Sequence, residues 1–309
     1  MHSLRQPTRL FVLGALLLAA AVQQAAAQET AAYPNGTSGL KAGTVPPPGR
    51  YWLCYNRIYQ ADINRDAAGD IATGPGGEPL GFDVLGYANV HRFLFVTEHQ
   101  ILGADYAWNA VLPIVDLDVD IAAAGIHDHE CRIGDLNLEP FILEWRKPRY
   151  EFGYVYGLFA PTAPRSDTNP ALPGKAHWTH YIGAAGTYYF DEERTWAISF
   201  LSRYEISTRL NYKDVTPGDN FSFEWGFSKT LEETLDVGVS GYCSWQTTLD
   251  RGSDVDYPNV LDHAFALGPE IQYFSPKYKI GYALRHWWEF GVRDRTQGTI
   301  TTLTFIKPF

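Results

Sequence analysis

The chain has 309 residues, a formal net charge of −10 and a mean hydropathy of −0.22. The acidic balance disfavours a nucleic-acid partner, because phosphate binding relies on clustered Lys and Arg. Aromatic residues make up 15% of the chain, more than a soluble core needs, and the three cysteines, an odd number, do not indicate a disulfide framework.

The N-terminus has the pattern of a secretory signal peptide. Arg5 and Arg9 precede an apolar run over residues 10–22, and Ala25-Ala26-Ala27 forms a small-residue cleavage site. The run is shorter than the roughly 20 apolar residues that a membrane-spanning helix needs. We therefore expect residues 1–27 to be removed on export, and an uncleaved helical anchor is the alternative.

The next segment, residues 28–49, is rich in Ala, Gly, Thr and Pro and ends in Pro46-Pro47-Pro48-Gly49. This composition favours an extended or flexible chain over a folded unit. We expect it to be a flexible leader in the periplasm, followed by one domain over residues 50–309.

From Arg50 onward, apolar and polar residues alternate with a period of two. In the clearest case Leu235, Val237 and Val239 share one face of a predicted strand. Because no other apolar run is long enough for a spanning helix, any membrane crossing must use strands. The alternation predicts about twelve strands, near residues 50–62, 82–98, 104–117, 132–146, 149–160, 177–190, 195–210, 220–229, 234–249, 262–274, 278–292 and 297–309.

The connections between these segments alternate in length. Short turns such as 147–149 and 275–277 alternate with long polar loops such as 63–81, 118–131 and 161–176. Outer-membrane barrels have this pattern. We predict an all-β transmembrane, antiparallel up-and-down β-barrel with both termini in the periplasm. A secreted β-sandwich is the alternative, but soluble strands average about 5–6 residues, shorter than these segments.

The chain ends in an aromatic residue on an alternating strand. Thr301, Leu303, Phe305 and Phe309 lie on one face of this predicted strand. A terminal Phe at this position is what the barrel assembly machinery of Gram-negative bacteria reads on its clients. We therefore expect Phe309 to be the assembly signal, and the partners to include that machinery and the lipid of the outer membrane.

Charged residues on the polar faces of the strands would face the lumen of such a barrel. Charges of both signs there indicate a permeation path with selectivity, and a lumen packed shut by paired charges is the alternative. The lumen and selectivity candidates are Glu151, Arg203, Glu205, Glu224, Asp236, Glu270, Arg285 and Glu289.

The sequence indicates neither a metal site nor a catalytic site. The cluster of His127, Asp128, His129, Glu130 and Cys131 lacks a second ligand pair, so we expect a solvated loop and no metal. No nucleophile elbow and no phosphate-binding loop appear. We expect no cofactor and no enzymatic activity. An enzyme acting on lipid is the alternative, and it would need a lipid-facing His/Ser pair on adjacent strands.

From about Gly134 to Phe309 the chain resembles the outer-membrane proteins of the family named for a meta-pathway of phenol degradation. The resemblance implies a channel or transporter for small hydrophobic or aromatic solutes, linked to their catabolism. It implies no catalytic residues, and Ala163 stands where the family has glycine. The matching residues are Gly134-Asp135-Leu136, Pro140-Phe141, Gly157-Leu158-Phe159-Ala160-Pro161-Thr162, Trp178, Gly183, Tyr204-Glu205, Thr216-Pro217-Gly218-Asp219, Gly238-Val239, Gly241-Tyr242, Gln246, Gly268-Pro269, Gln297-Gly298 and Lys307-Pro308-Phe309.

Overall fold

The computed structural model describes residues 31–74, 76–255 and 259–309, so the expected signal peptide lies outside the described residues. Within these ranges no helix is long and apolar enough to cross a membrane. The regular structure consists of one short 3₁₀ turn, η1 (Ala122–Ala124), and of strands β1 (Gly49–Asn64), β2 (Phe82–Ile101), β3 (Ala104–Ile121), β4 (Ile126–Ile133), β5 (Leu136–Arg146), β6 (Tyr150–Ala160), β7 (Thr179–Tyr189), β8 (Trp196–Ser207), β9 (Asn220–Leu231), β10 (Leu235–Gln246), β11 (His263–Ser275), β12 (Ile280–Arg293) and β13 (Thr296–Pro308).

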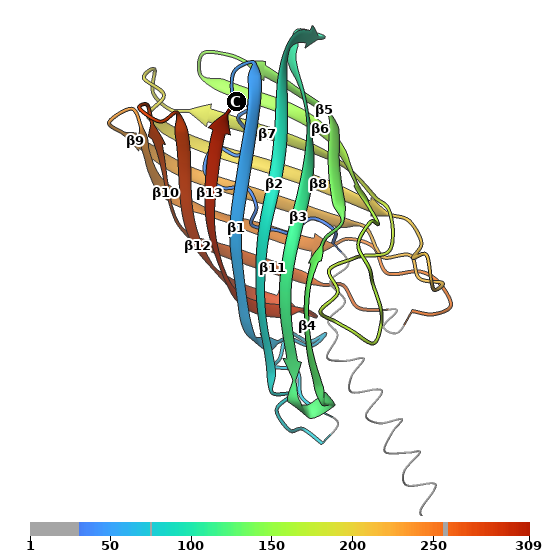
Figure 1. Cartoon of the computed structure of the whole chain (residues 1–309). Helices are drawn as coiled ribbons and strands as arrows, with labels where there is room; N and C mark the ends of the chain where they lie inside the picture. Colours follow the sequence, from blue (N-terminus) through green and yellow to red (C-terminus); the bar gives the residue numbers. More distant parts are fainter. Residues whose placement is uncertain (1–30, 75, 256–258) are drawn as a thin grey trace, which may run out of the picture.

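All strands except β4 form a closed, twelve-stranded antiparallel wall (Figure 1). Neighbours in the wall follow one another in the chain, except that β4 lies between β3 and β5, and the pairing of β13 with β1 closes the ring. Closure leaves no unpaired edge in the ring of twelve strands, so neighbouring strands supply hydrogen-bond partners for its backbone without help from water. The predicted up-and-down barrel of about twelve strands is confirmed.

One predicted loop is instead a hairpin. Residues 118–131 were expected to form an external loop, but β3 continues to Ile121 and β4 returns along its end. Leu117, Val119 and Ile121 keep the period of two, and the polar residues between them occupy the opposite face. The extended strands β2, β3 and β4 project beyond the rest of the wall at the end with the long loops (Figure 1).

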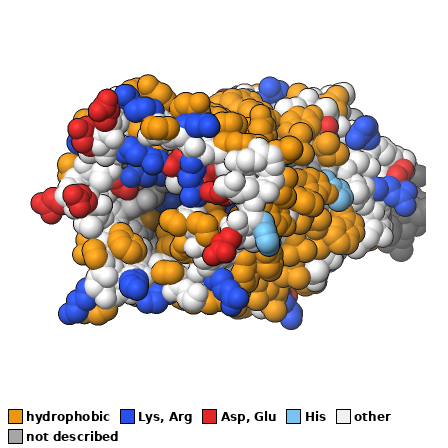
Figure 2. Space-filling model, turned by 90° about the horizontal axis from the view of Figure 1, so that it is seen from above, with side chains coloured by type: hydrophobic (Ala, Val, Ile, Leu, Met, Phe, Trp, Pro, Cys, Tyr) orange, Lys and Arg blue, Asp and Glu red, His pale blue; other side chains and the backbone are white. Residues whose placement is uncertain are grey.

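The two faces of each strand have opposite chemistry, as the alternation predicts. On β12, Trp287 is fully buried and faces the interior, whereas its neighbour Trp288 is 51% exposed on the outside. Figure 2, which views the molecule from above, shows hydrophobic side chains covering the flank and charged side chains gathered around a hollow at the barrel end. The outside therefore suits hydrocarbon and the inside does not.

The connections differ between the two ends of the barrel. At one end short turns join the strands, such as that between β2 and β3, and the C-terminus lies there (Figure 1). The other end carries the long connections, including those over residues 161–178 and 208–219. The alternation of short and long connections is confirmed, with the short turn between Arg293 and Thr296 as the expected exception. The periplasmic position of the termini stays a prediction.

Candidate functional site

The barrel interior contains the chain's own N-terminal residues. We call residues 31–48 the lumen segment. Its backbone N–H groups donate to wall carboxylates: Ala32 to Glu205 at 2.8 Å and Val45 to Glu144 at 2.7 Å. The expectation of a flexible periplasmic leader is therefore wrong for these residues. Their unpaired backbone donors and the buried carboxylates of the wall satisfy one another, which neither could do alone away from water.

Glu224 is the strongest anchor of the lumen segment. Its carboxylate accepts the backbone N–H groups of Gly36 at 2.7 Å, Thr37 at 3.2 Å and Ser38 at 3.0 Å. Successive N–H groups that converge in this way form a nest, an arrangement that binds anions. Glu224 is 1% exposed, so its charge depends on these donors for stabilisation.

Further along, both signs of charge hold the lumen segment. Lys41 Nζ pairs with Asp236 at 2.8 Å. Here the segment supplies the donor, whereas at Thr37 the wall does so: the guanidinium of Arg285 donates to the carbonyl oxygen of Thr37 at 2.6 Å. The wall therefore binds both the donors and the acceptors of this backbone, which fixes its position along the barrel axis.

Glycines allow the lumen segment to approach the wall closely. Gly43 lies against the backbone of Gly186 on β7, with no room for a Cβ atom. Leu40 packs in the same way over Gly226 and Gly238 of β9 and β10. These three wall glycines form a shallow seat that side chains would fill.

The predicted lumen residues all lie inside the barrel, in two groups. Six contact the lumen segment: Arg203, Glu205, Glu224, Asp236, Glu270 and Arg285. The other two bind residues of the strands and turns instead. Glu151 pairs with Arg194, and Glu289 accepts a hydrogen bond from Tyr59 at 3.0 Å.

Sequence reasoning missed a second set of interior charges on β5. Glu139 pairs with Arg92 at 3.0 Å, and Glu144 pairs with Arg146 at 2.6 Å. Strict alternation would place residues 139 and 144 on opposite faces. A bulge between Leu138 and Phe141 shifts the register, so both point inward. Pro140, which cannot donate to a ladder, marked this irregularity in the sequence.

An internal cavity of about 350 Å³ lies between the lumen segment and the wall. Leu53, Leu94 and Ile142 of β1, β2 and β5 give it an apolar part, and Arg92, Glu139 and Glu144 of β2 and β5 also line it. Arg203 and Arg285 line it as well. The cavity is thus amphipathic, and a solute inside it would contact both hydrocarbon and fixed charge.

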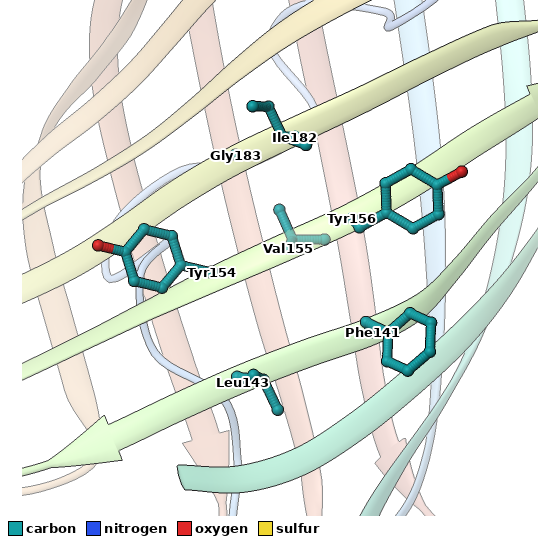
Figure 3. A pocket seen from close by; sticks show the side chains of 7 residues that line it. All are labelled: Phe141, Leu143, Tyr154, Val155, Tyr156, Ile182 and Gly183. Carbon is teal, nitrogen blue, oxygen red and sulfur yellow. The ribbon is translucent and has the colours of Figure 1, made fainter. Parts of the chain in front are cut away.

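A groove of about 340 Å³ lies on the outer face over β5, β6 and β7. Figure 3 shows its lining, with Tyr154 and Tyr156 on β6 and Phe141 on β5. This groove and the internal cavity share Leu143, Tyr154 and Val155, so a single layer of wall separates them.

The His and Asp residues of the β3–β4 hairpin pair with one another. His129 Nε2 lies 2.6 Å from Asp116, and this carboxylate raises the pKa of His129 by hydrogen bonding to it. His127 lies 3.1 Å from Asp120. Among the described residues no group of three or more His, Cys, Asp and Glu side chains could hold a metal ion.

The closed wall, its apolar outside and its polar interior define an outer-membrane type of β-barrel. The sequence matches the family described as "Putative MetA-pathway of phenol degradation" over residues 61–305, and the chain belongs to that family. Among curated proteins, none matches the chain.

Solved structures share the architecture at low sequence identity. The COG4313 outer membrane channel from Pseudomonas putida F1 superposes with a TM-score of 0.75 at 12% identity, over 90% of this chain and 100% of that one. The β domain of the Bordetella autotransporter BrkA gives 0.48 at 11% identity, over 85% and 100%. The CymD monoaromatic hydrocarbon channel gives 0.42 at 12% identity, over 85% and 89%. The first of these shows that the fold is shared.

Proposed function

We propose that this protein is an outer-membrane channel through which small hydrophobic or aromatic molecules cross. One observation carries the proposal: the lumen is filled by a separate segment, residues 31–48, and not by the side chains of the wall alone. A barrel of about twelve strands is wider than the eight-stranded kind that side chains fill. A separate segment can move without disturbing the wall.

The internal cavity supports passage of a small solute. An apolar cavity of about 150 Å³ is enough to hold benzene, and this cavity measures about 350 Å³. Its apolar lining would bind an aromatic ring, and its charges would select among polar substituents. The family description and the printed name of CymD, a monoaromatic hydrocarbon channel, agree with this solute class.

The lumen charges then have two roles in the proposal. Glu205, Glu224 and Glu270 hold the segment that closes the path, and Arg203 and Arg285 face the cavity that a solute would enter. Selectivity would follow from which solutes can replace contacts of the lumen segment. We further propose that the chain lies in the outer membrane of a Gram-negative bacterium, assembled there through Phe309.

The alternative of an enzyme acting on lipid finds no support in the outward histidines. His286 bonds the hydroxyl of Thr301 at 2.7 Å, and His180 bonds that of Tyr156 at 3.0 Å. His91 accepts from the indole of Trp52 at 3.1 Å. None of these three bonds pairs a histidine with a serine.

The test is passage itself. The refolded full-length protein is placed in planar bilayers and in proteoliposomes, and conductance and uptake of toluene and phenol are recorded. The matched variant replaces residues 31–48 with a Gly/Ser sequence of equal length. We expect wild type to conduct weakly and to pass aromatic solutes, and the variant to conduct more strongly. If both stay silent to ions and solutes, the barrel is a structural one with a packed lumen.

A further inference from the structure

The lumen segment carries a phenol into the interior of the barrel. Tyr33 is 6% exposed, and its hydroxyl donates to Glu224 at 3.1 Å. The guanidinium carbon of Arg203 lies 3.8 Å from the centre of the Tyr33 ring. An anionic acceptor for the hydroxyl and a cation over the ring face are the two polar contacts that a free phenol would need.

The surroundings of the ring are apolar and belong to the wall. Tyr33 packs in one cluster with Leu94, Ile142, Val155 and Phe159. These residues come from β2, β5 and β6, and three of them, Leu94, Ile142 and Val155, also line the internal cavity. The Tyr33 ring and the space that we propose solutes to enter therefore share three residues of the wall and lie next to each other.

The face of the Arg203 guanidinium lies against aromatic rings. Its side chain is nearly fully buried, yet Nε and Nη1 have no hydrogen-bond partner among the described residues, and the ion pair with Glu139 is long, at 3.5 Å. The second ring beside the guanidinium is that of Tyr181, 5.7 Å away. A buried guanidinium with unmatched donors is costly unless something compensates it, and ring faces are what surround it here.

Glu224 is held ready for a hydroxyl in the same way. Its other contacts are the N–H groups of residues 36–38, which do not depend on the Tyr33 side chain. Removal of the ring would leave the carboxylate in place with one acceptor position free.

We propose that Tyr33 occupies a binding site for phenols, and that para-substituted phenols reach this site from the internal cavity and take the place of its ring. Arg203 would lie over the ring of the bound phenol, and Glu224 would accept a hydrogen bond from its hydroxyl group. The inference rests on the proposed function and names its solute class. A bound phenol breaks two contacts of the lumen segment, so binding and release of the segment are linked.

The first measurement is binding of p-cresol, the free analogue of the Tyr side chain, to the refolded full-length protein by calorimetry. Tyr33→Ala should bind p-cresol at least about tenfold more tightly than wild type, because wild type must first expel its own ring. Toluene, which lacks the hydroxyl, should bind Tyr33→Ala about tenfold more weakly than p-cresol. Glu224→Gln in the Tyr33→Ala background should reduce that discrimination.

A second comparison tests the role of Arg203 against that of another buried arginine, Arg295. In the Tyr33→Ala background, Arg203→Lys keeps the charge and removes the planar face, so p-cresol binding should fall about tenfold. Arg295→Lys alters a second buried arginine, which pairs with Asp262 at 3.4 Å, and should leave p-cresol affinity unchanged. Equal affinity of wild type and Tyr33→Ala, or equal losses in the two Lys variants, would overturn the assignment.

The second measurement follows the lumen segment in the unaltered protein. Lys41 is the only Lys or Arg between residues 31 and 49, and its Nζ binds Asp236 inside the barrel. We expect p-cresol, in a saturable manner, to accelerate trypsin cleavage after Lys41, and toluene to do so much less. Cleavage after Arg209, in an exposed loop, is the internal control and should not change.

Passage of toluene and phenol into proteoliposomes, measured in parallel, separates the two claims. If solutes pass but p-cresol neither prefers Tyr33→Ala nor exposes Lys41, the phenol site is wrong and the channel stands. If p-cresol binds as predicted but nothing passes, the site stands and the channel function is wrong.

Discussion

Two buried glutamates of the lumen, Glu224 and Glu289, receive their hydrogen bonds from different parts of the molecule. Glu224 is satisfied by the lumen segment, through three backbone N–H groups and Tyr33. Glu289 is satisfied by the wall, through Tyr59, Tyr242 and the backbone of Gly298. The first arrangement can be undone by moving one segment, whereas the second can be undone only by opening the barrel. Part of this lumen is therefore removable and part is permanent.

The largest effect is expected in the permanent part. Tyr242→Ala removes a side chain that is 1% exposed and leaves Glu289 with Tyr59 as its one remaining hydroxyl donor among the described residues. The free energy of unfolding should fall by about 3–5 kcal/mol, measured by urea titration of the refolded barrel. Tyr242→Phe, which removes only the hydroxyl, should cost about 1–3 kcal/mol. Trypsin cleavage after Lys41 should stay slow in both, and rapid cleavage would show that the two parts are not independent.

A smaller effect on a different quantity is expected at the removable part. Glu224→Gln removes the negative charge of the acceptor and so weakens the hydrogen bonds that Gly36, Thr37 and Ser38 donate to it. The lumen segment should be released more easily by about 2 kcal/mol, a roughly thirtyfold faster cleavage after Lys41. The urea transition of the barrel should barely move. Glu289→Gln is the control. An equal gain in cleavage after Lys41 in that variant would show that Glu224 has no special role in holding the lumen segment.

The seat of the lumen segment can be tested without touching a charge. Gly43→Ala places a methyl group against the backbone of Gly186, so the segment must move away from β7. We expect its release to become easier by about 1–3 kcal/mol, again read from trypsin cleavage after Lys41. In the control Gly49→Ala, the nearest atom to the new carbon is the Tyr51 hydroxyl at 3.2 Å, a side chain that can shift. Equal cleavage in the two variants would show that the close approach of Gly43 to Gly186 does not hold the lumen segment in place.

The smallest effect is expected outside the wall, on the β3–β4 hairpin. Asp116 raises the pKa of His129, so the pair contributes stability that is present below the ordinary His pKa of 6.5 and is lost as pH rises through the raised value. Amide exchange of β4, corrected for intrinsic rates, should therefore show less protection at about pH 8.5 than at about pH 6. Asp116→Asn should abolish this difference. Persistence of the difference in that variant would assign it to another group.

The strands and their faces were accessible from the sequence because a barrel wall has one repeating requirement. Every outward position meets hydrocarbon and every inward position does not, so Trp287 and Trp288 could be assigned to opposite faces by counting alone. The hairpin at β4 was missed because its polar residues, such as Asp118 and His129, which lie opposite each other in register, resemble those of a loop. The inward position of residues after Pro140 was missed because the extra residue of the bulge exchanges the inward and outward faces for all residues of the strand that follow it.

The lumen segment left one usable signal in the sequence. The predicted interior face held six carboxylates against two arginines, an imbalance that requires additional donors. The glycines of residues 36–43 offered such donors with no side chain to obstruct them. No local pattern connects the two, because the contact between Gly36 and Glu224 spans 188 positions of the chain.

The sequence by itself determined the period of the strands, the apolar outside, the polar inside and the family to which the chain belongs. Only the tertiary structure decided what fills the lumen. Periodicity is a local property of each strand, whereas the site for residues 31–48 exists only once the ring has closed and buried carboxylates converge on one axis. A segment without a period of its own then takes its conformation from the hydrogen bonds that the closed barrel leaves unmade.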